Sequence, residues 1–434
     1  MRAVDIIEKK KQGYTLTKEE IEFFINGYME GFIEDYQMSA WLMAVCFQGL
    51  SFDETAYLTE CFINSGDKLD FSDFNVHIAD KHSTGGVGDK VTLVLIPLLA
   101  SLGVACAKLS GRGLGMTGGT IDKLESIKGF NCALSEDDFK NQIRKINAAI
   151  SSQTPNLVPA DGKIYALRDV TATVDNMSLI CASVVSKKIA SGADIIVLDV
   201  KYGSGAFIKT KDEARILADL MIETGARLNK KIDAVISAME QPLGNCVGNS
   251  LEVMEAIEFL KGKMAPDLYE ITVEIAARTL MLANLVTDYD MAKNYIDDAI
   301  MSGRALNKLS EIIEAQGGDK NVINDYSLFE IGHNTYEIKA EMGGYISRLN
   351  ALDIAHSCKL LGAGREKKTD KIDFGAGCVL NKKEGDLVKH NETLATLYFN
   401  NVSKERLDEA INYAKSAYSI TLDRVEKHSV VADI

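Results

Sequence analysis

The sequence predicts an α/β protein that has a helical N-terminal unit and a β-rich C-terminal portion. Three residue patterns along the 434 residues indicate this class. Helical periodicity extends to about Ser65, apolar runs that end in glycines fill the middle, and short strand-like runs begin at about Tyr336. A hydrophobic fraction of 46% supplies enough apolar surface for two or three domains.

The first segment, Thr17 to about Ser65, is predicted to be helical. Thr17 and Glu20 have the spacing of a capping box, which marks the start of a helix. The apolar residues that follow share one helical face: Ile21, Phe24, Ile25 and Tyr28. A small helical unit therefore opens the chain.

Three apolar runs in the middle of the chain end in glycines: VTLVLIPLLASLGV, VACAKLSGRGLG and ADIIVLDVKYGSG. Such runs are typical of the strands and helices of a buried, largely parallel sheet. In open sheets of this kind, ligands bind at the carboxyl ends of the strands. The glycine-rich loops are therefore where we expect the functional site.

The remainder of the chain divides into a helical and a β-rich part. A second capping-box pattern at Thr210 and Glu213 opens a helical stretch that extends to about Gly317, with breaks expected at Gly225 and Gly262. Short strands and glycine turns follow from Tyr336, and an amphipathic stretch covers 403–419.

Charge and composition exclude several classes of protein. The 48 Lys and Arg residues against 62 Asp and Glu give a net charge of −14, which disfavours general nucleic-acid binding. No stretch of about 18 uncharged apolar residues is present, so we expect no membrane span. The charged N-terminus lacks the apolar run of a signal peptide, and we expect a cytoplasmic protein.

Cysteine and histidine spacing argues against a soft-metal site. The eight cysteines are well separated along the chain, and most lie in apolar runs, where a reduced thiol packs as a small hydrophobic group. The six histidines show none of the spacings of a zinc enzyme. Any metal is therefore expected to bind through oxygen.

The loop Asp80–Asp89, DKHSTGGVGD, combines a lysine, two hydroxyls and three glycines. Glycines let backbone N–H groups converge on an anion, and lysine adds a positive charge. This pattern favours a phosphate cradle. An ordinary turn is the alternative interpretation, and a second loop of the same kind weakens it.

That second loop, Lys108–Thr120, contains a GxGxxG pattern at Gly113, Gly115 and Gly118. A dinucleotide site would need an acidic residue at the end of the next strand, but the acids of ALSEDDF look like the start of a helix. No Walker A pattern occurs, so a nucleoside triphosphate is not favoured.

A third group of polar residues comprises Arg168, Ser183 and Lys187. In a helix extending to Gly192, Ser183 and Lys187 lie one turn apart on the same face. A guanidinium beside a hydroxyl and an ammonium suits a flat heterocycle that carries oxygen atoms. A solvated helix with an ordinary salt bridge remains the alternative.

Four motifs together resemble the thymidine/pyrimidine-nucleoside phosphorylase family over essentially the whole chain. They are DKHSTGGVGD from Asp80, SGRGLGMTGGTIDKLESI from Ser110, YALRDVTATV from Tyr165 and SKKIASGADIIVLDVKYGSGAF from Ser186. The resemblance implies a small helical domain and a larger α/β domain across a cleft, with a β-rich C-terminal portion. The implied ranges are 1–66 with 159–192, 67–158 with 193–335, and 336–434.

The implied reaction is reversible phosphorolysis of pyrimidine nucleosides (uridine, thymidine, deoxyuridine) to free base and pentose 1-phosphate. By resemblance, His82, Arg168 and Lys187 are catalytic, and the nucleoside base contacts His82, Arg168, Ser183 and Lys187. Phosphate is expected on Lys81, Ser83, Thr92, Lys108, Ser110 and Thr120. Inorganic phosphate is then the co-substrate, no organic cofactor is expected, and the protein is expected to be a homodimer.

Three other functions are alternative interpretations of the sequence. A strict thymidine phosphorylase and an anthranilate-type phosphoribosyltransferase are the alternative enzymes, and the second would need acidic residues arranged for magnesium and diphosphate. The C-terminal KKEGDLVKHNETLATLY resembles a lipoyl or biotinyl hairpin, which suggests a carrier module. The lysine motif of such carriers is missing from the sequence, so structural packing is favoured.

The sequence departs from the family pattern at three positions. Met116 stands where the family usually has histidine, and Tyr202 replaces a smaller residue. The resemblance also implies a potassium site at Gly88, Lys90, Leu243, Cys246 and Glu255, where the family usually has threonine at position 90. Lys90 is expected either to put its ammonium where the ion would bind or to point to solvent.

Overall fold

The structure is a computed structural model that describes residues 1–74, 76–113, 118–154, 156–367 and 369–432. The chain forms two compact units. The first unit consists of Met1–His82, Gln153–Leu198 and Asp212–Ala234, and the second of Ser83–Ser152, Asp199–Lys211 and Val235–Ile434. The predicted ranges 1–66 and 159–192 both fall within the first unit, while the domain boundaries themselves stay a prediction.

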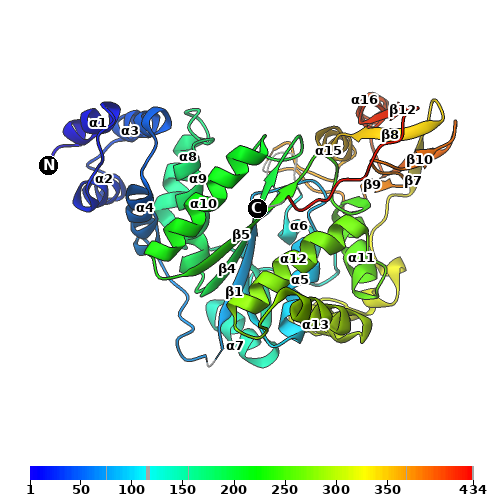
Figure 1. Cartoon of the computed structure of the whole chain (residues 1–434), viewed down its shortest axis with the longest axis horizontal. Coiled ribbons are helices and arrows are strands. Elements are labelled where there is room, and N and C mark those ends of the chain that lie inside the picture. The colour runs from blue at the N-terminus through cyan, green and yellow to red at the C-terminus, as the bar shows by residue number, and fades with distance from the viewer. Residues whose placement is uncertain (75, 114–117, 155, 368, 433–434) are drawn as a thin grey trace. The chain divides into compact units, whose positions relative to one another are not determined.

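The first unit is mainly helical, as the N-terminal periodicity predicts. Helices α1 to α4 pack together near the N-terminus, and α4 packs along α9 (Figure 1). The predicted capping box is confirmed, because the Thr17 hydroxyl accepts from the Glu20 N–H while the Glu20 carboxylate accepts from the Thr17 N–H. The helices are α1 (Ala3–Lys11), α2 (Lys18–Glu30), α3 (Asp35–Gln48), α4 (Phe52–Asn64), α8 (Pro159–Arg168), α9 (Met177–Ala190) and most of α10 (Lys211–Arg227).

The N-terminal helices enclose a core of aromatic side chains and one ion pair. The rings of Phe24 and Trp41 stack with centroids 5.3 Å apart, and both are buried. Lys10 and Glu54 form a buried ion pair at 2.8 Å, and the Glu54 carboxylate also accepts from the Leu16 N–H. This pair joins α1 to α4 across the helical core.

A five-stranded sheet has the strand order β3-β2-β1-β4-β5. Strands β2 and β3 run parallel, with Cys106 opposite Ala148, as the apolar runs predict. The borders of the two units fall inside β1, β4 and β5. The strands are β1 (Ile78–Ser83), β2 (Ala105–Ser110), β3 (Ala148–Ser152), β4 (Ile195–Tyr202) and β5 (Lys231–Ala238).

The helices of the second unit surround α5 (Val91–Ser101), whose apolar residues are buried on all sides. A helix that is apolar all round has to lie inside the protein, and α5 packs against α11, α12, α13 and α14. The other elements are α6 (Thr120–Leu124), α7 (Glu136–Ile146), α11 (Asn249–Leu260), α12 (Pro266–Leu282), α13 (Tyr289–Met301), α14 (Arg304–Ala315), η1 (Lys320–Ile323) and η2 (Tyr326–Leu328).

The two glycines expected to break helices behave differently. Gly262 follows the end of α11 and has φ +89°, so that prediction is confirmed. The prediction for Gly225 is wrong, because α10 continues through it to Arg227. A Cβ at Gly225 would lie 2.4 Å from the Ile232 side chain, so this glycine permits close packing of helix on strand.

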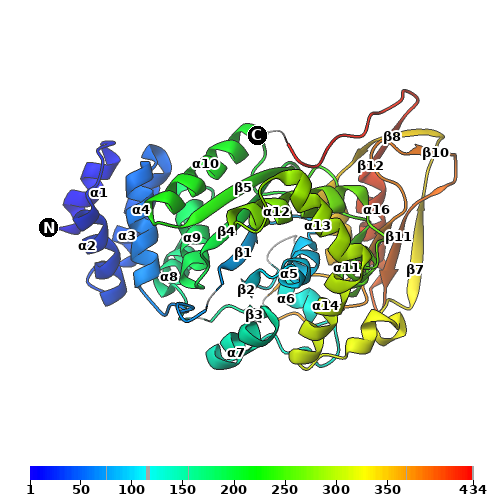
Figure 2. The same cartoon turned by 60° about the horizontal axis from the view of Figure 1, so that its bottom comes forward.

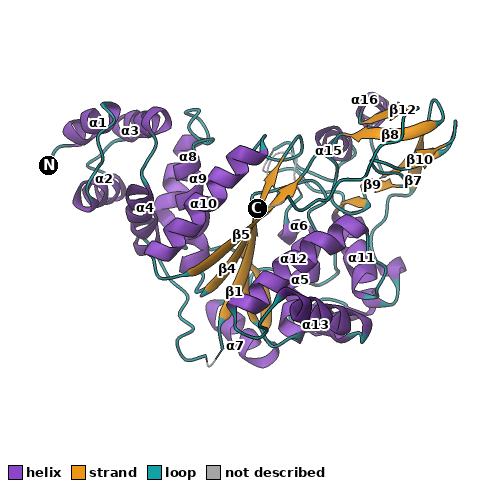
Figure 3. Cartoon of the chain, in the orientation of Figure 1, coloured by secondary structure: helices purple, strands orange, loops and turns teal. Residues whose placement is uncertain are grey.

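The C-terminal portion is rich in antiparallel strands, which confirms its predicted β character. One sheet has the order β6-β9-β11-β7 and a smaller one the order β10-β8-β12. Figures 2 and 3 show these strands together with α15 and α16 within the second unit. The elements are β6 (Cys246–Gly248), β7 (Asn334–Lys339), β8 (Gly344–Leu349), α15 (Ala351–Leu360), β9 (Gly377–Leu380), β10 (Leu387–Val388), β11 (Thr393–Phe399), α16 (Lys404–Ser416) and β12 (Tyr418–Thr421).

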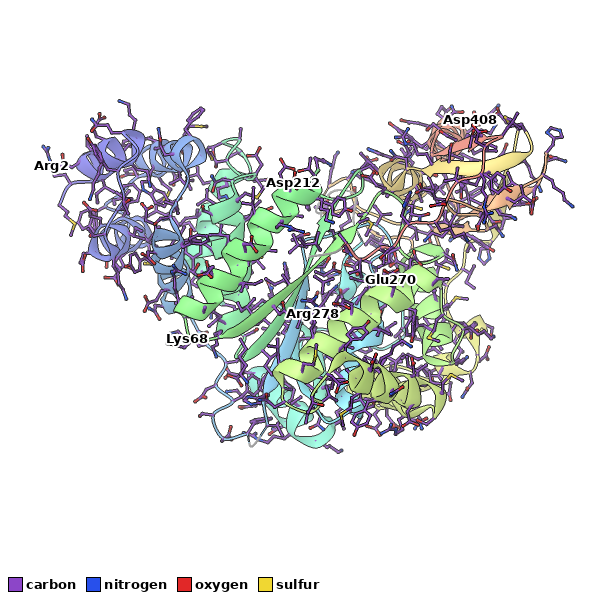
Figure 4. All side chains as sticks on the ribbon, in the orientation of Figure 1. Arg2, Lys68, Asp212, Glu270, Arg278 and Asp408 are labelled. Atoms are coloured by element: carbon purple, nitrogen blue, oxygen red, sulfur yellow. The ribbon has the colours of Figure 1, made fainter. Side chains whose placement is uncertain are left out.

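The chain after β12 is anchored on α12. The carboxylate of Glu270, labelled in Figure 4, accepts from the Ser429 hydroxyl and from the N–H groups of Val430 and Val431. The Ala238 N–H of β5 donates to the Val430 carbonyl. Within the described part of the chain, no helix is both long enough and apolar enough to cross a membrane.

Candidate active site

The first glycine loop follows β1 in the second unit and is held by its own hydroxyls. The Ser83 Oγ accepts from the Gly85 N–H at 3.2 Å, and the Thr84 Oγ1 accepts from the Lys201 N–H at 2.9 Å. Gly85 has φ +100°, and a Cβ at Gly86 would lie 2.6 Å from the Met239 side chain. Glycine is therefore required at both positions if the loop is to keep this path.

Gly88 brings the same loop close to the segment that precedes β6. It has φ +71°, and a Cβ there would lie 2.6 Å from the Leu243 carbonyl oxygen. The Leu243 N–H in turn donates to the Val87 carbonyl at 3.0 Å. The loop is thus fixed by backbone contacts that leave no room for a side chain at Gly88.

Both glycine loops line one small cavity in the second unit. Its volume is about 40 Å³. Its lining includes Gly88 of the first loop, Gly113 and Gly118 of the second, and Asp122, Glu252 and Arg365. The two loops that the sequence singled out therefore come together, as expected from the convergence of strand ends.

The second loop is organised by Asp122, a buried carboxylate that the sequence analysis did not single out. It accepts from the Gly113 N–H at 2.6 Å, and both Arg112 and Arg365 pair with it. Aspartate side chains often accept from backbone N–H groups in loops, but no local sequence pattern identified Asp122 as such a residue. Gly115 and Met116 lie outside the described residues.

The other predicted phosphate ligands of the second unit lie at element ends. Thr92 is in the first turn of α5 and Thr120 begins α6, while Lys108 and Ser110 are at the carboxyl end of β2. Helix N-termini and the adjacent N–H groups favour anions. Only 4% of the Lys108 surface is exposed. The phosphate-binding role of these residues stays a prediction.

Lys81 and His82 lie on β1 in the first unit, where Lys81 is buried and His82 half-buried. The neighbouring Asp80 pairs with Lys188 of α9 at 2.8 Å, and both side chains are buried. This pair ties the start of the first motif to the helix that carries Ser183 and Lys187. The sequence contains both residues within quoted motifs but gave no sign of their pairing.

Ser183 and Lys187 share one face of α9, as their spacing predicts. The Lys187 Nζ donates to the Ser183 Oγ at 2.7 Å and also pairs with the carboxylate of Asp161 on α8. Asp161 is 1% exposed, and its Oδ1 has no hydrogen-bond partner among the described residues. Sequence reasoning missed Asp161, because 26 residues separate it from Lys187.

Arg168, at the end of α8, holds the loop between α8 and α9. Its guanidinium donates to the backbone carbonyls of Thr173 at 3.0 Å, Val174 at 2.6 Å and Leu179 at 3.3 Å. Burial lowers the pKa of Arg168 from its ordinary value, although nearby Asp161 opposes this. The structure therefore gives Arg168 a loop-holding role, and its predicted contact with a base stays a prediction.

We expect the substitution Arg168→Ala to destabilise the protein. It would remove the side-chain donor from three carbonyl groups, of which those of Thr173 and Leu179 belong to buried residues. An unpaired buried group costs about 1–3 kcal/mol, so the free energy of unfolding should fall by about 2 kcal/mol or more. Urea unfolding followed by circular dichroism measures this loss. Arg168→Lys, which keeps a charge and some donors, should lose less, and equal stability of all three proteins would contradict the loop-holding role.

The implied potassium site is filled by a side chain. The Lys90 Nζ donates to the carbonyls of Leu243 and Cys246 and to the carboxylate of Glu255, at 2.7, 2.8 and 2.7 Å. The ammonium thus occupies the position among these oxygens where an ion would bind, so the residues present do not fit potassium. Elsewhere in the described chain, no cluster of His, Cys, Asp and Glu is arranged to hold a metal ion.

The helical bundle, the α/β sheet and the glycine loops at its strand ends define a class that comparison with protein families identifies as glycosyl transferases. The helical-bundle domain of the glycosyl transferase family matches residues 4–66, and its α/β domain matches residues 75–306. The C-terminal domain of pyrimidine nucleoside phosphorylase matches residues 345–421.

Relatives that match the whole chain show which kind of glycosyl transferase this is. The pyrimidine-nucleoside phosphorylases of Staphylococcus epidermidis and Staphylococcus haemolyticus are each 49% identical to this chain over 97% of its length and 98% of theirs. The chain belongs to the pyrimidine-nucleoside phosphorylase family, which confirms the resemblance seen in its motifs.

A solved structure shares the fold. Anthranilate phosphoribosyltransferase from Thermus thermophilus matches 72% of this chain and 99% of its own, with a TM-score of 0.57 and 18% sequence identity. At that identity the likeness shows the fold alone. The predicted fold class, a helical domain with a larger α/β domain, is confirmed.

Proposed function

We propose that this protein catalyses the reversible phosphorolysis of pyrimidine nucleosides to free base and pentose 1-phosphate. The observation that carries the proposal is 49% identity along 97% of the chain to relatives named for this activity. The meeting of the two glycine loops at one cavity supports it, because ligands of open α/β sheets bind at the loops that follow the carboxyl ends of the strands. Uridine, thymidine and deoxyuridine are the proposed substrates.

In the proposed reaction, a phosphate oxygen forms a bond to the anomeric carbon while the bond from that carbon to the base nitrogen breaks. The electron pair of the broken bond goes to the base, and positive charge builds on the sugar ring, as in glycoside hydrolysis. The proton of the hydrogen phosphate ends on the base, which leaves as the neutral free base. The phosphate dianion stabilises the sugar cation as it attacks. The balance of the reaction needs no covalent enzyme intermediate.

The proposed roles combine the family resemblance of the motifs with the charges and hydrogen bonds of the side chains. Ser83, Lys108 and the other predicted phosphate ligands hold the nucleophile. Lys187, oriented by Ser183 and Asp161, donates to the carbonyl oxygen of the departing base, with His82 and Arg168 as the other proposed partners. Donors fixed before the reaction stabilise the developing anion without a cost of reorganisation.

A homodimer in the cytoplasm belongs to the same proposal. The family resemblance of the motifs supports both the dimer and the location. Sedimentation equilibrium of the purified protein should give twice the mass of the 47.4 kDa chain.

The direct test is a phosphate-dependent assay with uridine, thymidine and inosine at equal concentrations. We expect base release from the two pyrimidine nucleosides in the presence of phosphate and none in its absence. Inosine, a purine nucleoside, serves as the matched control for general glycosidic cleavage. Release from inosine alone, or release that does not need phosphate, would contradict the proposal.

A further inference from the structure

Lys90 is a buried lysine whose ammonium is fully coordinated by oxygen. It is the N-cap residue of α5 and its side chain is 0% exposed. An ammonium has three N–H donors, and here they meet three acceptors: the carbonyls of Leu243 and Cys246 and the Glu255 carboxylate. The charge is thus fully satisfied without solvent.

The acceptors are themselves held in place. The Glu255 carboxylate receives the N–H groups of Asn245 at 2.6 Å and Cys246 at 2.9 Å. A Cβ at Gly244 would lie 2.8 Å from both the Lys90 Nζ and the Glu255 carboxylate oxygens. The segment 243–246 therefore lies close around the ammonium, and no side chain fits at position 244.

The electrostatics keep the lysine charged. Burial on its own lowers the pKa of Lys90, but the carboxylates of Glu255 and Glu252 outweigh burial and raise the pKa above its ordinary value. Two carbonyl oxygens and a carboxylate around one positive charge also make a donor set that suits a bound monovalent cation.

We propose that Lys90 is a tethered cation that takes the place of a bound potassium ion and clamps the first glycine loop to the segment 243–246. The clamp acts at a point where the loop is already tight, since Gly88 contacts the Leu243 carbonyl and the Lys90 N–H donates to the Gly88 carbonyl at 2.9 Å. Lys90 is thus a positioning residue. It holds the loop that carries Ser83 and begins the helix that carries Thr92.

If Lys90 replaces the ion, the thermal stability of the unmodified protein should not depend on potassium, whereas a variant with a shorter side chain at position 90 should need potassium for full stability. The unmodified protein should unfold at the same temperature in potassium chloride and sodium chloride of equal ionic strength. Lys90→Thr removes the ammonium and leaves the three oxygens around a space. Its midpoint should be lower in sodium and should rise by at least about 2 °C in potassium or ammonium, because a ligand that binds only the folded state stabilises it.

Lys10→Thr is the matched control. Lys10 is also a buried lysine paired with a glutamate, Glu54, but among the described residues its ammonium donates to no backbone carbonyl. This variant should lose stability equally in both salts. Lys90→Met, whose side chain refills the space, should likewise show no response to potassium.

The measurement does not use nucleoside cleavage, so it stays informative if the proposed function fails. A midpoint of the unmodified protein that rises in potassium over sodium would overturn the proposal. The proposal would also be overturned if the Lys90→Thr protein had the same unfolding midpoint in both salts, or were unfolded in both. A Lys90→Thr protein that folds only in potassium or ammonium would support it.

Discussion

Replacing Lys187 with alanine should lower kcat/KM for uridine by about 100-fold, the cost of losing one donor to a developing anion. The side chain is 25% exposed, so its ammonium can reach a bound molecule. Its position is set by the Ser183 hydroxyl and by Asp161, which hold the ammonium on one side of α9. Steady-state kinetics with varied uridine at saturating phosphate measures the effect.

Loss of Lys187 is also expected to affect stability, because of its partner Asp161. Asp161 is buried, and alanine at position 187 would leave its charge without a partner, which destabilises proteins. The double substitution Asp161→Asn with Lys187→Ala removes both charges and separates lost stability from lost catalysis. Lys68, an exposed lysine of the same unit labelled in Figure 4, provides the control Lys68→Ala, which should keep full activity. Full activity of the folded double variant would exclude Lys187 from the site.

Replacing Lys108 with methionine should lower kcat/KM for phosphate by about 100-fold while the KM for uridine changes little. Methionine keeps a stem of similar length in the buried strand β2, so packing should be preserved while the charge is lost. The charge matters because a phosphate dianion in a partly dry site gains most from a fixed cation. The measurement is a phosphate titration at saturating uridine.

The matched control is Lys145→Met, an exposed lysine in the last turn of α7 of the same unit. It should leave both KM values unchanged. The Lys187 and Lys108 variants thus form a pair with opposite expectations, one for the nucleoside and one for phosphate. An effect of Lys108→Met on uridine alone would contradict its assignment to phosphate.

Local patterns in the sequence were enough to predict features that span a single turn of helix. The Thr17 and Glu20 capping box, the helix start after Ser135 and the shared face of Ser183 and Lys187 all appear as expected. Each depends on residues three or four positions apart, which the helical period brings together wherever the helix lies. The apolar runs likewise predicted the class of the fold, because buried parallel strands need them.

Single-residue rules were less dependable. Glycine at position 225 was expected to end a helix, yet Ile232 packs against the space where its Cβ would be, and the helix continues. Arg168 donates to the carbonyls of Thr173 and Val174, which its sequence pattern did not indicate, while its predicted contact with a base stays a prediction. At Gly225, packing against the neighbouring strand decided the outcome rather than local propensity.

The sequence by itself determined the fold class, the positions of both glycine loops and, through its motifs, the family. Only the tertiary structure decided the partners of other charged groups: Asp161 beside Lys187 and Asp80 beside Lys188. The members of these pairs lie 26 and 108 residues apart. A buried charge has to find an opposite charge or a set of dipoles, but it can find them on any element that packing brings near, and no local spacing encodes which one.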